Sequence, residues 1–322
     1  MPIYKFTPDL QNSEELKKLF VGREKLLKDI LGKIEKATIT GTSKNCIIIG
    51  PRGIGKTHLL LLIYYSINES KLRNHLIPIK FAEEEYSIFD LADLILKILE
   101  HMNEEVDIPT SEFIEALKKK DKTEILESSL EFIRKFKIEK NKRLLLLLEN
   151  LQLIFDQFGN EDISRFRDIL QREDFFMIIG TAPTFFDKIA KYEEPFYNFF
   201  ETIYLNKLSP EDIEELIKKR AEYDESDVLK NFEDFRPRIK AISILTGGNP
   251  RLVLMLYQII TENQLIEVGN ALLKLLDEMT PFFQARMESL PAQQRKILDT
   301  LALMDGPATP TEIAKTSRIK GI

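Results

Sequence analysis

One eight-residue segment limits the folds open to this chain more than any other feature. Residues 50–57 read GPRGIGKT and fit the pattern G-x-x-x-x-G-K-[ST], with the apolar run NCIIIG before it and the helix pattern GKTHLLLLIYYSINES after it. Glycines let backbone N–H groups turn around phosphate oxygens, and a helix N-terminus adds a favourable dipole. Strand, glycine loop and helix in this order predict a phosphate-binding loop (P-loop) in an α/β fold. The alternative is a glycine turn before a core helix.

The loop supplies most of the candidate nucleotide-binding residues. Lys56 would place a point charge at the β- and γ-phosphates, and the hydroxyl of Thr57 would ligate Mg²⁺. The candidates are Gly50, Pro51, Arg52, Gly53, Ile54, Gly55, Lys56, Thr57 and His58. We therefore expect a nucleotide and Mg²⁺ as cofactors.

The apolar segments indicate how the rest of the chain is organised. Runs that read as strands alternate with helix patterns as far as residue 208, at 45–50, 75–81, 143–150, 175–180 and 201–208. Because these runs are apolar on both faces, they predict a parallel sheet covered by helices on both sides. After residue 208 only helix patterns remain, at 210–223, 236–246, 249–263 and 266–279.

The C-terminal segment begins another unit. Helix patterns over 291–304 and 309–317, with Thr309 or Thr311 as a cap, open as a helix-turn-helix or winged-helix domain does. We expect a P-loop α/β domain over 1–208, a helical lid domain over 209–280 and a partial winged helix over 281–322. DNA is a potential partner of this last segment, although its positive charge is mild.

A second candidate site feature follows the strand RLLLLLEN at 143–150. A strand beside the strand that precedes the phosphate loop should end in an acid near the metal, and Glu149 is placed to do so. Asn150 then stands where a water-activating glutamate is expected, and an amide can orient water but cannot accept its proton. The alternative is that the two residues only cap the strand.

Charge, cysteine content and apolar run length indicate which partners and which cellular compartment to expect. The formal net charge is −6, so the surface as a whole should not attract nucleic acid. Cys46 is the single cysteine, which excludes an intrachain disulfide and agrees with a reducing compartment. The N-terminus has no apolar signal core, and the longest apolar runs are too short to span a bilayer. We expect a cytoplasmic protein without a membrane partner.

Upstream of the loop, LFVGREKLLKDI at 19–30 resembles the adenine-flanking box of AAA+ ATPases, nearest to the origin-recognition initiators and the STAND signalling ATPases. The resemblance implies that Val21 and Gly22 line an adenine pocket and that the nucleotide is ATP. Thr181, in IIGTAP, corresponds to the polar sensor-1 position. It also implies a five-stranded sheet of order 5-1-4-3-2 followed by a helical lid.

Within the expected lid, LTGGNPRLVLML at 245–256 resembles two family motifs. Arg251 matches the sensor-2 arginine of initiators. Pro250 matches the proline of the STAND G-x-P motif, which borders the nucleotide.

The chain also departs from the family pattern. No arginine occurs between Arg172 and Arg220, where an arginine finger that accelerates hydrolysis is expected. Together with Asn150, this predicts an ATPase with slow turnover, acting as a switch toward a protein partner or a second copy of itself. Three alternatives stay open: an active oligomeric ATPase acting on DNA, a small-molecule P-loop kinase, and a DNA-binding regulator with a vestigial nucleotide site.

Overall fold

The computed structural model describes residues 8–82, 87–106, 111–262, 273, 287, 290–304, 306 and 308–317. Its contacts divide the chain into two compact units, Met1–Leu254 and Met255–Ile322. The three-part division expected at residues 208 and 280 stays a prediction. In the described part of the chain, no helix combines the length and the apolar character needed to cross a membrane.

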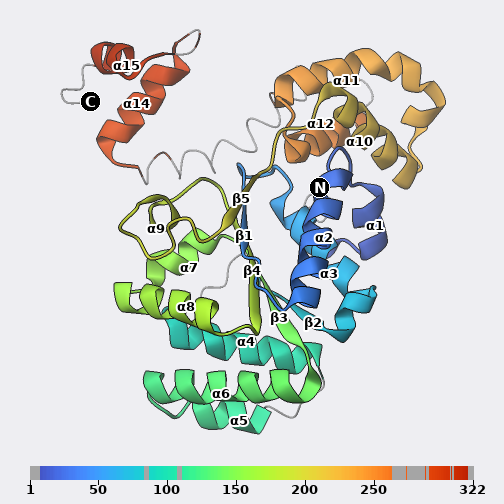
Figure 1. Ribbon diagram of the computed structural model, residues 1–322. Coiled ribbons are helices and arrows are strands. Elements are labelled where there is room, and N and C mark those ends of the chain that lie inside the picture. The colour runs from blue at the N-terminus through green and yellow to red at the C-terminus, as the bar shows by residue number, and fades with distance from the viewer. Residues whose placement is uncertain are drawn as a thin grey trace. The chain divides into compact units, whose positions relative to one another are not determined.

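The first unit is built on a five-stranded sheet in which every pairing is parallel (Figure 1). Read from one edge, the strand order is β5-β1-β4-β3-β2. This is the order 5-1-4-3-2 that the family resemblance implied, so the fold class is confirmed. The strands are β1 (Cys46–Ile49), β2 (Leu76–Lys80), β3 (Arg143–Leu148), β4 (Phe176–Ala182) and β5 (Glu201–Tyr204).

The leucine run of β3 shows why both faces of the sheet are covered. All six residues of β3 are buried. Leu144, Leu146 and Leu148 belong to one hydrophobic cluster, and Leu145 and Leu147 belong to another. Because successive side chains of a strand point to opposite faces, a strand that is apolar throughout requires helices on both sides.

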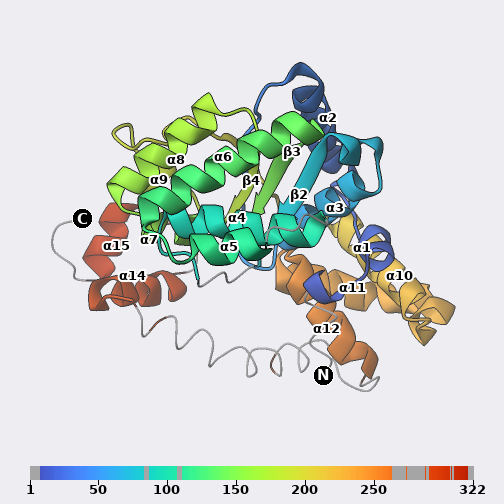
Figure 2. The ribbon, with the colours of Figure 1, turned by 90° about the horizontal axis from the view of Figure 1, so that it is seen from below.

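Helices pack on each face of this sheet (Figures 1 and 2). The cluster that contains Leu145 and Leu147 is closed by α2 and α3, and the other cluster by α4 to α8. The helices of this part are α1 (Ser13–Lys18), α2 (Glu24–Thr40), α3 (Lys56–Asn68), α4 (Leu91–Glu105), α5 (Ser111–Leu117), α6 (Lys122–Lys140), α7 (Leu151–Gln157), α8 (Asn160–Arg172) and α9 (Asp187–Ala190), with short 3₁₀ turns η2 (Pro8–Leu10) and η3 (Lys71–Asn74).

After β5 the described chain is helical, as the sequence predicted. The elements are α10 (Pro210–Tyr223), η4 (Asp227–Asn231), α11 (Phe232–Thr246) and α12 (Pro250–Glu262). Ser209 and Asp212 form a capping box at the start of α10. The helix expected from residue 236 begins earlier, at Phe232, so that Pro237 lies inside α11 and leaves one backbone hydrogen bond unmade.

In the second unit, two helices of the C-terminal segment agree with the sequence patterns. These are α14 (Ala292–Ala302) and α15 (Pro310–Ser317). Thr309 is the cap of α15, because its hydroxyl accepts from Glu312 N at 3.4 Å and its own N–H donates to Glu312 Oε2 at 2.7 Å. The helix expected over 266–279 lies outside the described residues except for residue 273. The winged helix stays a prediction.

Candidate nucleotide-binding site

The phosphate loop joins the carboxyl end of β1 to the first turn of α3. Gly50 N donates to Ala182 O at 3.2 Å, which fixes the start of the loop against β4. Gly53 and Gly55 have φ values of +81° and +99°, in the region that favours glycine. The loop therefore enters α3 through a turn that most other residues would strain.

The loop lysine lies over the loop itself. Lys56 Nζ donates to Gly50 O at 2.7 Å and to Pro51 O at 3.2 Å. An ammonium group has three donors and turns freely on its stem, so the same group can turn to phosphate oxygens.

The strand acid contacts the loop, but its strand is not beside β1 as predicted, because β4 lies between β3 and β1. Thr57 Oγ1 donates to Glu149 Oε2 at 2.6 Å, and Glu149 is buried just after β3. A hydroxyl and a carboxylate side by side are oxygen ligands of the kind that Mg²⁺ prefers, so the residues fit this ion. Thr57 and Glu149 would hold the ion, and it would supply positive charge to offset the negative charge of the phosphates.

A residue that the sequence reasoning missed completes this group. Lys80, the last residue of β2, has its Nζ 3.6 Å from Glu149 Oε1, and it also forms an ion pair with Asp9. Its side chain is 14% exposed. The signal available in the sequence was a lysine ending a strand that is otherwise apolar.

The other two candidate catalytic residues contact each other. Asn150 N donates to the hydroxyl of Thr181 at 3.1 Å, and Thr181 is fully buried in β4. Asn150 has φ +48° and ψ +48°, the left-handed conformation that asparagine tolerates better than most residues. Asn150 thus also makes the turn from β3 into α7.

The box at 19–30 lies beside the start of α10. Val21 is buried, and Gly22 has φ +69°. A Cβ atom at Gly22 would lie 2.5 Å from the carboxylate of Asp212, which completes the capping box of α10 with Ser209. Close approach therefore requires glycine at this position, whether or not it also borders an adenine.

Arg23 is a second residue that the sequence reasoning missed. Its Nη1 donates to Ile54 O and its Nη2 donates to Asn206 O, both at 2.6 Å. Burial lowers the pKa of Arg23 to about 10, and the charge of Asp212 opposes this shift. The guanidinium thus joins the phosphate loop to the segment between β5 and α10. Its place directly after Gly22 in the family box was the available signal.

The expected lid motif touches the loop through its backbone and one side chain. Asn249 Nδ2 donates to Arg52 O at 3.0 Å, and Arg251 N donates to Gly53 O at 3.3 Å. Pro250 is the first residue of α12, where its missing N–H costs nothing. The side chain of Arg251 is exposed, so the structure places this residue at the loop without placing its guanidinium on the loop.

His58 uses its ring for packing. Its Nε2 lies 2.8 Å from Leu16 O, and the ring lies against Phe20 at 5.4 Å between centroids. Burial lowers the pKa of His58 to about 4; the hydrogen bond to Leu16 opposes this shift and the charge of Arg23 adds to it. A nucleotide contact by His58 would therefore come from its backbone.

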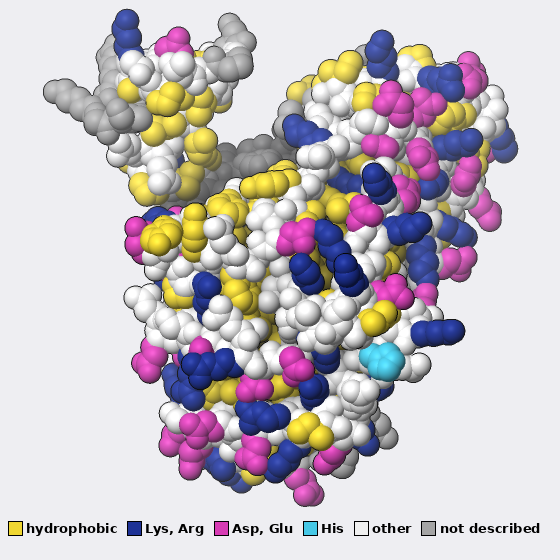
Figure 3. All heavy atoms as spheres, viewed as in Figure 1, with side chains coloured by type: hydrophobic (Ala, Val, Ile, Leu, Met, Phe, Trp, Pro, Cys, Tyr) yellow, Lys and Arg dark blue, Asp and Glu magenta, His cyan; other side chains and the backbone are white. Residues whose placement is uncertain are grey.

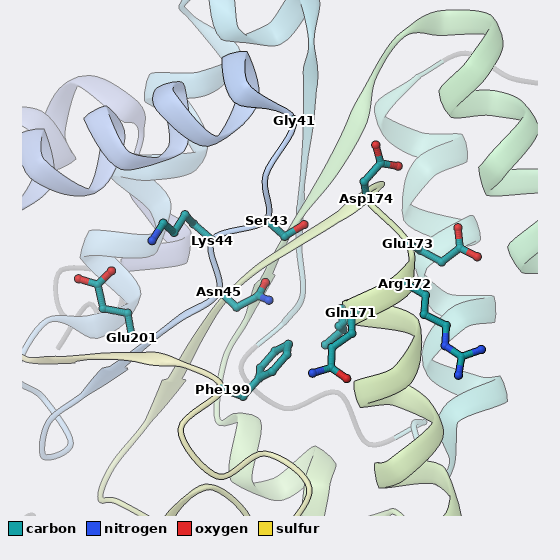
Figure 4. A pocket seen from close by; sticks show the side chains of 11 residues that line it. Gly41, Ser43, Lys44, Asn45, Gln171, Arg172, Glu173, Asp174, Phe199 and Glu201 are labelled. Carbon is teal, nitrogen blue, oxygen red and sulfur yellow. The ribbon is translucent and has the colours of Figure 1, made fainter.

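A hollow of about 460 Å³ lies at the other end of the sheet (Figure 4). Its lining includes Ser43, Lys44 and Asn45 before β1 and Glu173 and Asp174 before β4. Acidic and basic groups are mixed in it, and none of its lining residues belongs to the phosphate loop.

A phosphate loop, an acid after the third strand and a lid motif against the loop define a P-loop nucleotide-binding protein. The family model of the AAA ATPase domain matches residues 19–179, half of the chain, and the chain belongs to this family. This confirms the resemblance to AAA+ ATPases that the loop and the upstream box indicated, whereas the STAND motif at 248–250 stays a prediction.

Similar proteins share the fold at low identity. The Walker-type ATPase of Pyrococcus abyssi superposes with a TM-score of 0.61 at 14% identity, over 93% of this chain and 88% of that one. The Aeropyrum pernix Orc1 protein, solved in complex with DNA, gives 0.58 at 16% identity, over 93% and 77%. An uncharacterized HTH-type transcriptional regulator of Methanocaldococcus jannaschii is 24% identical over 335 residues, 92% of this chain and 78% of the relative.

Proposed function

We propose that this chain is a switch that binds ATP and Mg²⁺ and hydrolyses ATP slowly. The observation that carries the proposal is that the loop contacts both the strand acid and the lid motif, through Thr57–Glu149 and Asn249–Arg52. In this scheme Lys56 binds the β- and γ-phosphates and Arg251 reports the γ-phosphate to the lid. A ligand shifts a conformational equilibrium by its differential affinity for the two states, and contacts of this kind supply the difference.

Two features support slow hydrolysis. Asn150 can orient a water molecule but cannot accept its proton. The sequence has no arginine between Arg172 and Arg220 that could act on the γ-phosphate of a neighbour. The parts that bind ATP are thus present, while two parts that accelerate its hydrolysis are replaced or missing.

The experiment measures thermal unfolding and phosphate release in the same sample. ATP with Mg²⁺ should raise the Tm of the wild-type chain, because binding to the folded state alone stabilises it. Lys56→Ala should abolish the rise or reduce it severely. Turnover of roughly 1 s⁻¹ or more would contradict a slow switch.

A second variant tests the catalytic position. Asn150→Glu supplies a base and should raise phosphate release if Asn150 occupies the base position. The left-handed backbone at residue 150 is less favourable for glutamate, at about 1 kcal/mol, so the variant should also unfold at a slightly lower temperature. Unchanged turnover in a folded variant would mean that the position is assigned wrongly or that the missing finger limits the rate.

The partner belongs to the proposal too. We propose a protein partner or self-association, with DNA as the partner of the alternative function. The DNA complex of the Orc1 structure and the name of the M. jannaschii relative favour DNA, with α14 and α15 as the start of a reading module. On the face shown in Figure 3, basic and acidic side chains are interspersed over the first unit, which favours a partner other than DNA for that face.

Size measurement with and without ATP, together with turnover with and without DNA, separates these functions. A DNA-stimulated rate would favour an active ATPase on DNA, and phosphate transfer to an added acceptor would favour a kinase. No stabilisation by millimolar ATP and Mg²⁺ would favour a vestigial site. The upstream box and the lid motif weigh against a kinase. A cytoplasmic location is part of the same proposal.

A further inference from the structure

Three consecutive carbonyl groups of the phosphate loop each accept a hydrogen bond from outside the loop. Arg52 O accepts from Asn249 Nδ2 at 3.0 Å, Gly53 O accepts from Arg251 N at 3.3 Å, and Ile54 O accepts from Arg23 Nη1 at 2.6 Å. Two of the three donors belong to the motif GGNPR, which lies about two hundred residues further along the chain. The loop is therefore held by tertiary contacts as well as by its own sequence.

These contacts fix the direction of the loop peptides. In a trans peptide the carbonyl of one residue points away from the N–H of the next, and the described chain contains no cis peptide bond. Holding Arg52 O and Ile54 O from the outer side therefore turns the N–H groups of Gly53 and Gly55 the other way. Convergent N–H groups of this kind are what binds phosphate in such a loop.

Asn249 is the donor whose side chain has a second task. Its Oδ1 lies 3.1 Å from Arg251 N and 3.4 Å from Leu252 N, and its own carbonyl accepts from Val253 N at 3.0 Å. Asn249 is thus the cap of α12. A side-chain amide has both an acceptor and donors, so it can cap the helix and hold Arg52 O together. Aspartate has no donor, and serine is too short to span both groups.

The neighbouring glycine shows how closely the two parts meet. A Cβ atom at Gly53 would lie 2.8 Å from Asn249 Oδ1 and 3.1 Å from the Cβ of Arg251. A change in the loop at Gly53 must therefore move the cap of α12, and a change at the cap must move the loop.

We propose that Asn249 is a positioning residue that holds the phosphate loop in its binding geometry and transmits the state of the loop to the start of α12. This deepens the proposed nucleotide switch and rests on it. The coupling is reciprocal. If Asn249 stabilises the phosphate-binding conformation of the loop in one lid position, a loop that holds phosphate must stabilise that same lid position. Arg251 follows Asn249 by two residues and is carried with it.

The test separates the two tasks of Asn249 with two variants. Asn249→Ser keeps a neutral helix cap and loses the donor to Arg52 O, whereas Asn249→Ala loses both. Serine also adds no negative charge near the phosphates, which aspartate would do. Asp121→Ala is the matched control, because Asp121 caps α6 through Glu124 N and does not belong to the site. Each full-length variant is measured for its Tm without ligand, its affinity for ATP and Mg²⁺, and backbone hydrogen exchange over residues 53–57.

Asn249→Ser should keep its Tm without ligand within about 2 °C of the wild type. It should bind ATP about fivefold more weakly, which corresponds to one hydrogen bond, and its loop should exchange faster even without nucleotide. Asn249→Ala should bind as weakly and also unfold at a lower temperature. Asp121→Ala should lower the Tm and leave ATP affinity and loop exchange unchanged.

Wild-type affinity and wild-type loop exchange in Asn249→Ser would overturn the proposal, because Asn249 would then be a helix cap only. The exchange measurement needs no nucleotide. A wild-type chain that fails to bind ATP would therefore contradict the proposed function. Hydrogen exchange of the loop in Asn249→Ser would still decide whether Asn249 positions the loop.

Discussion

At the scale of single residues, Asn150 has a structural reason for its identity as well as a chemical consequence. It makes the turn between β3 and α7 in the left-handed conformation, and its N–H is held by Thr181. Asparagine is favoured in this conformation over most other residues. The same amide cannot take a proton from water, so under the proposed function the residue that suits the backbone would also slow ATP hydrolysis.

Lys80 gives the first prediction. Its ammonium lies 3.6 Å from Glu149, where it lowers the negative potential that a divalent cation would meet. Lys80→Met should therefore lower the Mg²⁺ concentration needed for half of the ATP-dependent rise in Tm, by about threefold to tenfold. The variant should also lose stability without ligand, because Glu149 and Asp9 lose their cationic partner.

Titration of Mg²⁺ at fixed ATP, followed by thermal unfolding, measures the effect. Lys97→Met is a suitable control, because Lys97 pairs with Glu100 on α4, outside the site. An unchanged Mg²⁺ requirement in Lys80→Met would show that the lysine does not influence metal binding. A raised requirement would show that the lysine supports it.

The sequence singled out candidate-site residues that a nearby motif marks, and it missed residues that reach the site from distant parts of the chain. The phosphate loop and Glu149 follow from a motif or a strand end within a few residues of each position, and Thr181 follows from the family resemblance. Arg23 and Asn249 act on carbonyls that are 183 and 197 residues away in the chain, at Asn206 and Arg52. No local pattern specifies such a pairing, because it depends on where the segments after β5 return to the sheet.

At the scale of elements, the short helix α1 joins two parts of the first unit. Glu15 Oε1 accepts from Arg220 Nη1 of α10 at 2.7 Å, and both side chains are almost fully buried. Leu16 O contacts the ring of His58 on α3. One helix of six residues thus binds both the helix of the phosphate loop and the first helix after the sheet.

This arrangement gives the second prediction. Glu15→Ala should lower the free energy of unfolding by about 2–3 kcal/mol, because the buried guanidinium of Arg220 loses one of its two carboxylate partners. Asp224 still accepts from Arg220, which keeps the loss below that of a fully unpaired charge. The pKa of Arg220 is raised by its hydrogen bonds to Asp224 and Glu15, against the effect of burial, so the charge will persist.

Urea unfolding measures the difference, and the helix provides its own control. Glu14 and Lys18 form an exposed pair on α1, so Glu14→Ala should cost less than about 1 kcal/mol. Equal effects of the two variants would mean that the Glu15–Arg220 contact adds little to the stability of the fold.

The same scale shows how far periodicity predicts structure. The alternation of apolar runs with helix patterns predicted all five strands of the described sheet, since a short run that is apolar on both faces fits a strand buried between two helix layers. The start of α11 was missed because Pro237 suggests a helix boundary, while Phe235 before it is buried on the same helix. Tertiary packing can override a local signal of this kind.

At the scale of the whole molecule, the candidate site gathers at one edge of the sheet. The loop follows β1, Glu149 follows β3, Lys80 ends β2 and Thr181 lies near the end of β4. Parallel strands place their carboxyl ends together, and ligands of open α/β sheets bind at that edge. The strand order was predictable only through the family resemblance, because periodicity identifies strands without ordering them.

Global stability supplies the last prediction, through His58. Its folded pKa of about 4 lies below its ordinary value of 6.5, so the unfolded chain takes up a proton first as the pH falls. The contribution of the neutral ring is complete above pH 6.5 and is lost as the pH falls toward 4, at up to about 1.4 kcal/mol per pH unit. Between pH 7 and 5, wild type should lose about 2 kcal/mol more than His58→Gln. Urea unfolding at both values tests this, with exposed His75→Gln as the control that should follow wild type. Parallel losses in all three proteins would show that acid destabilisation arises elsewhere, and that the contact of His58 with Leu16 does not depend on a neutral ring.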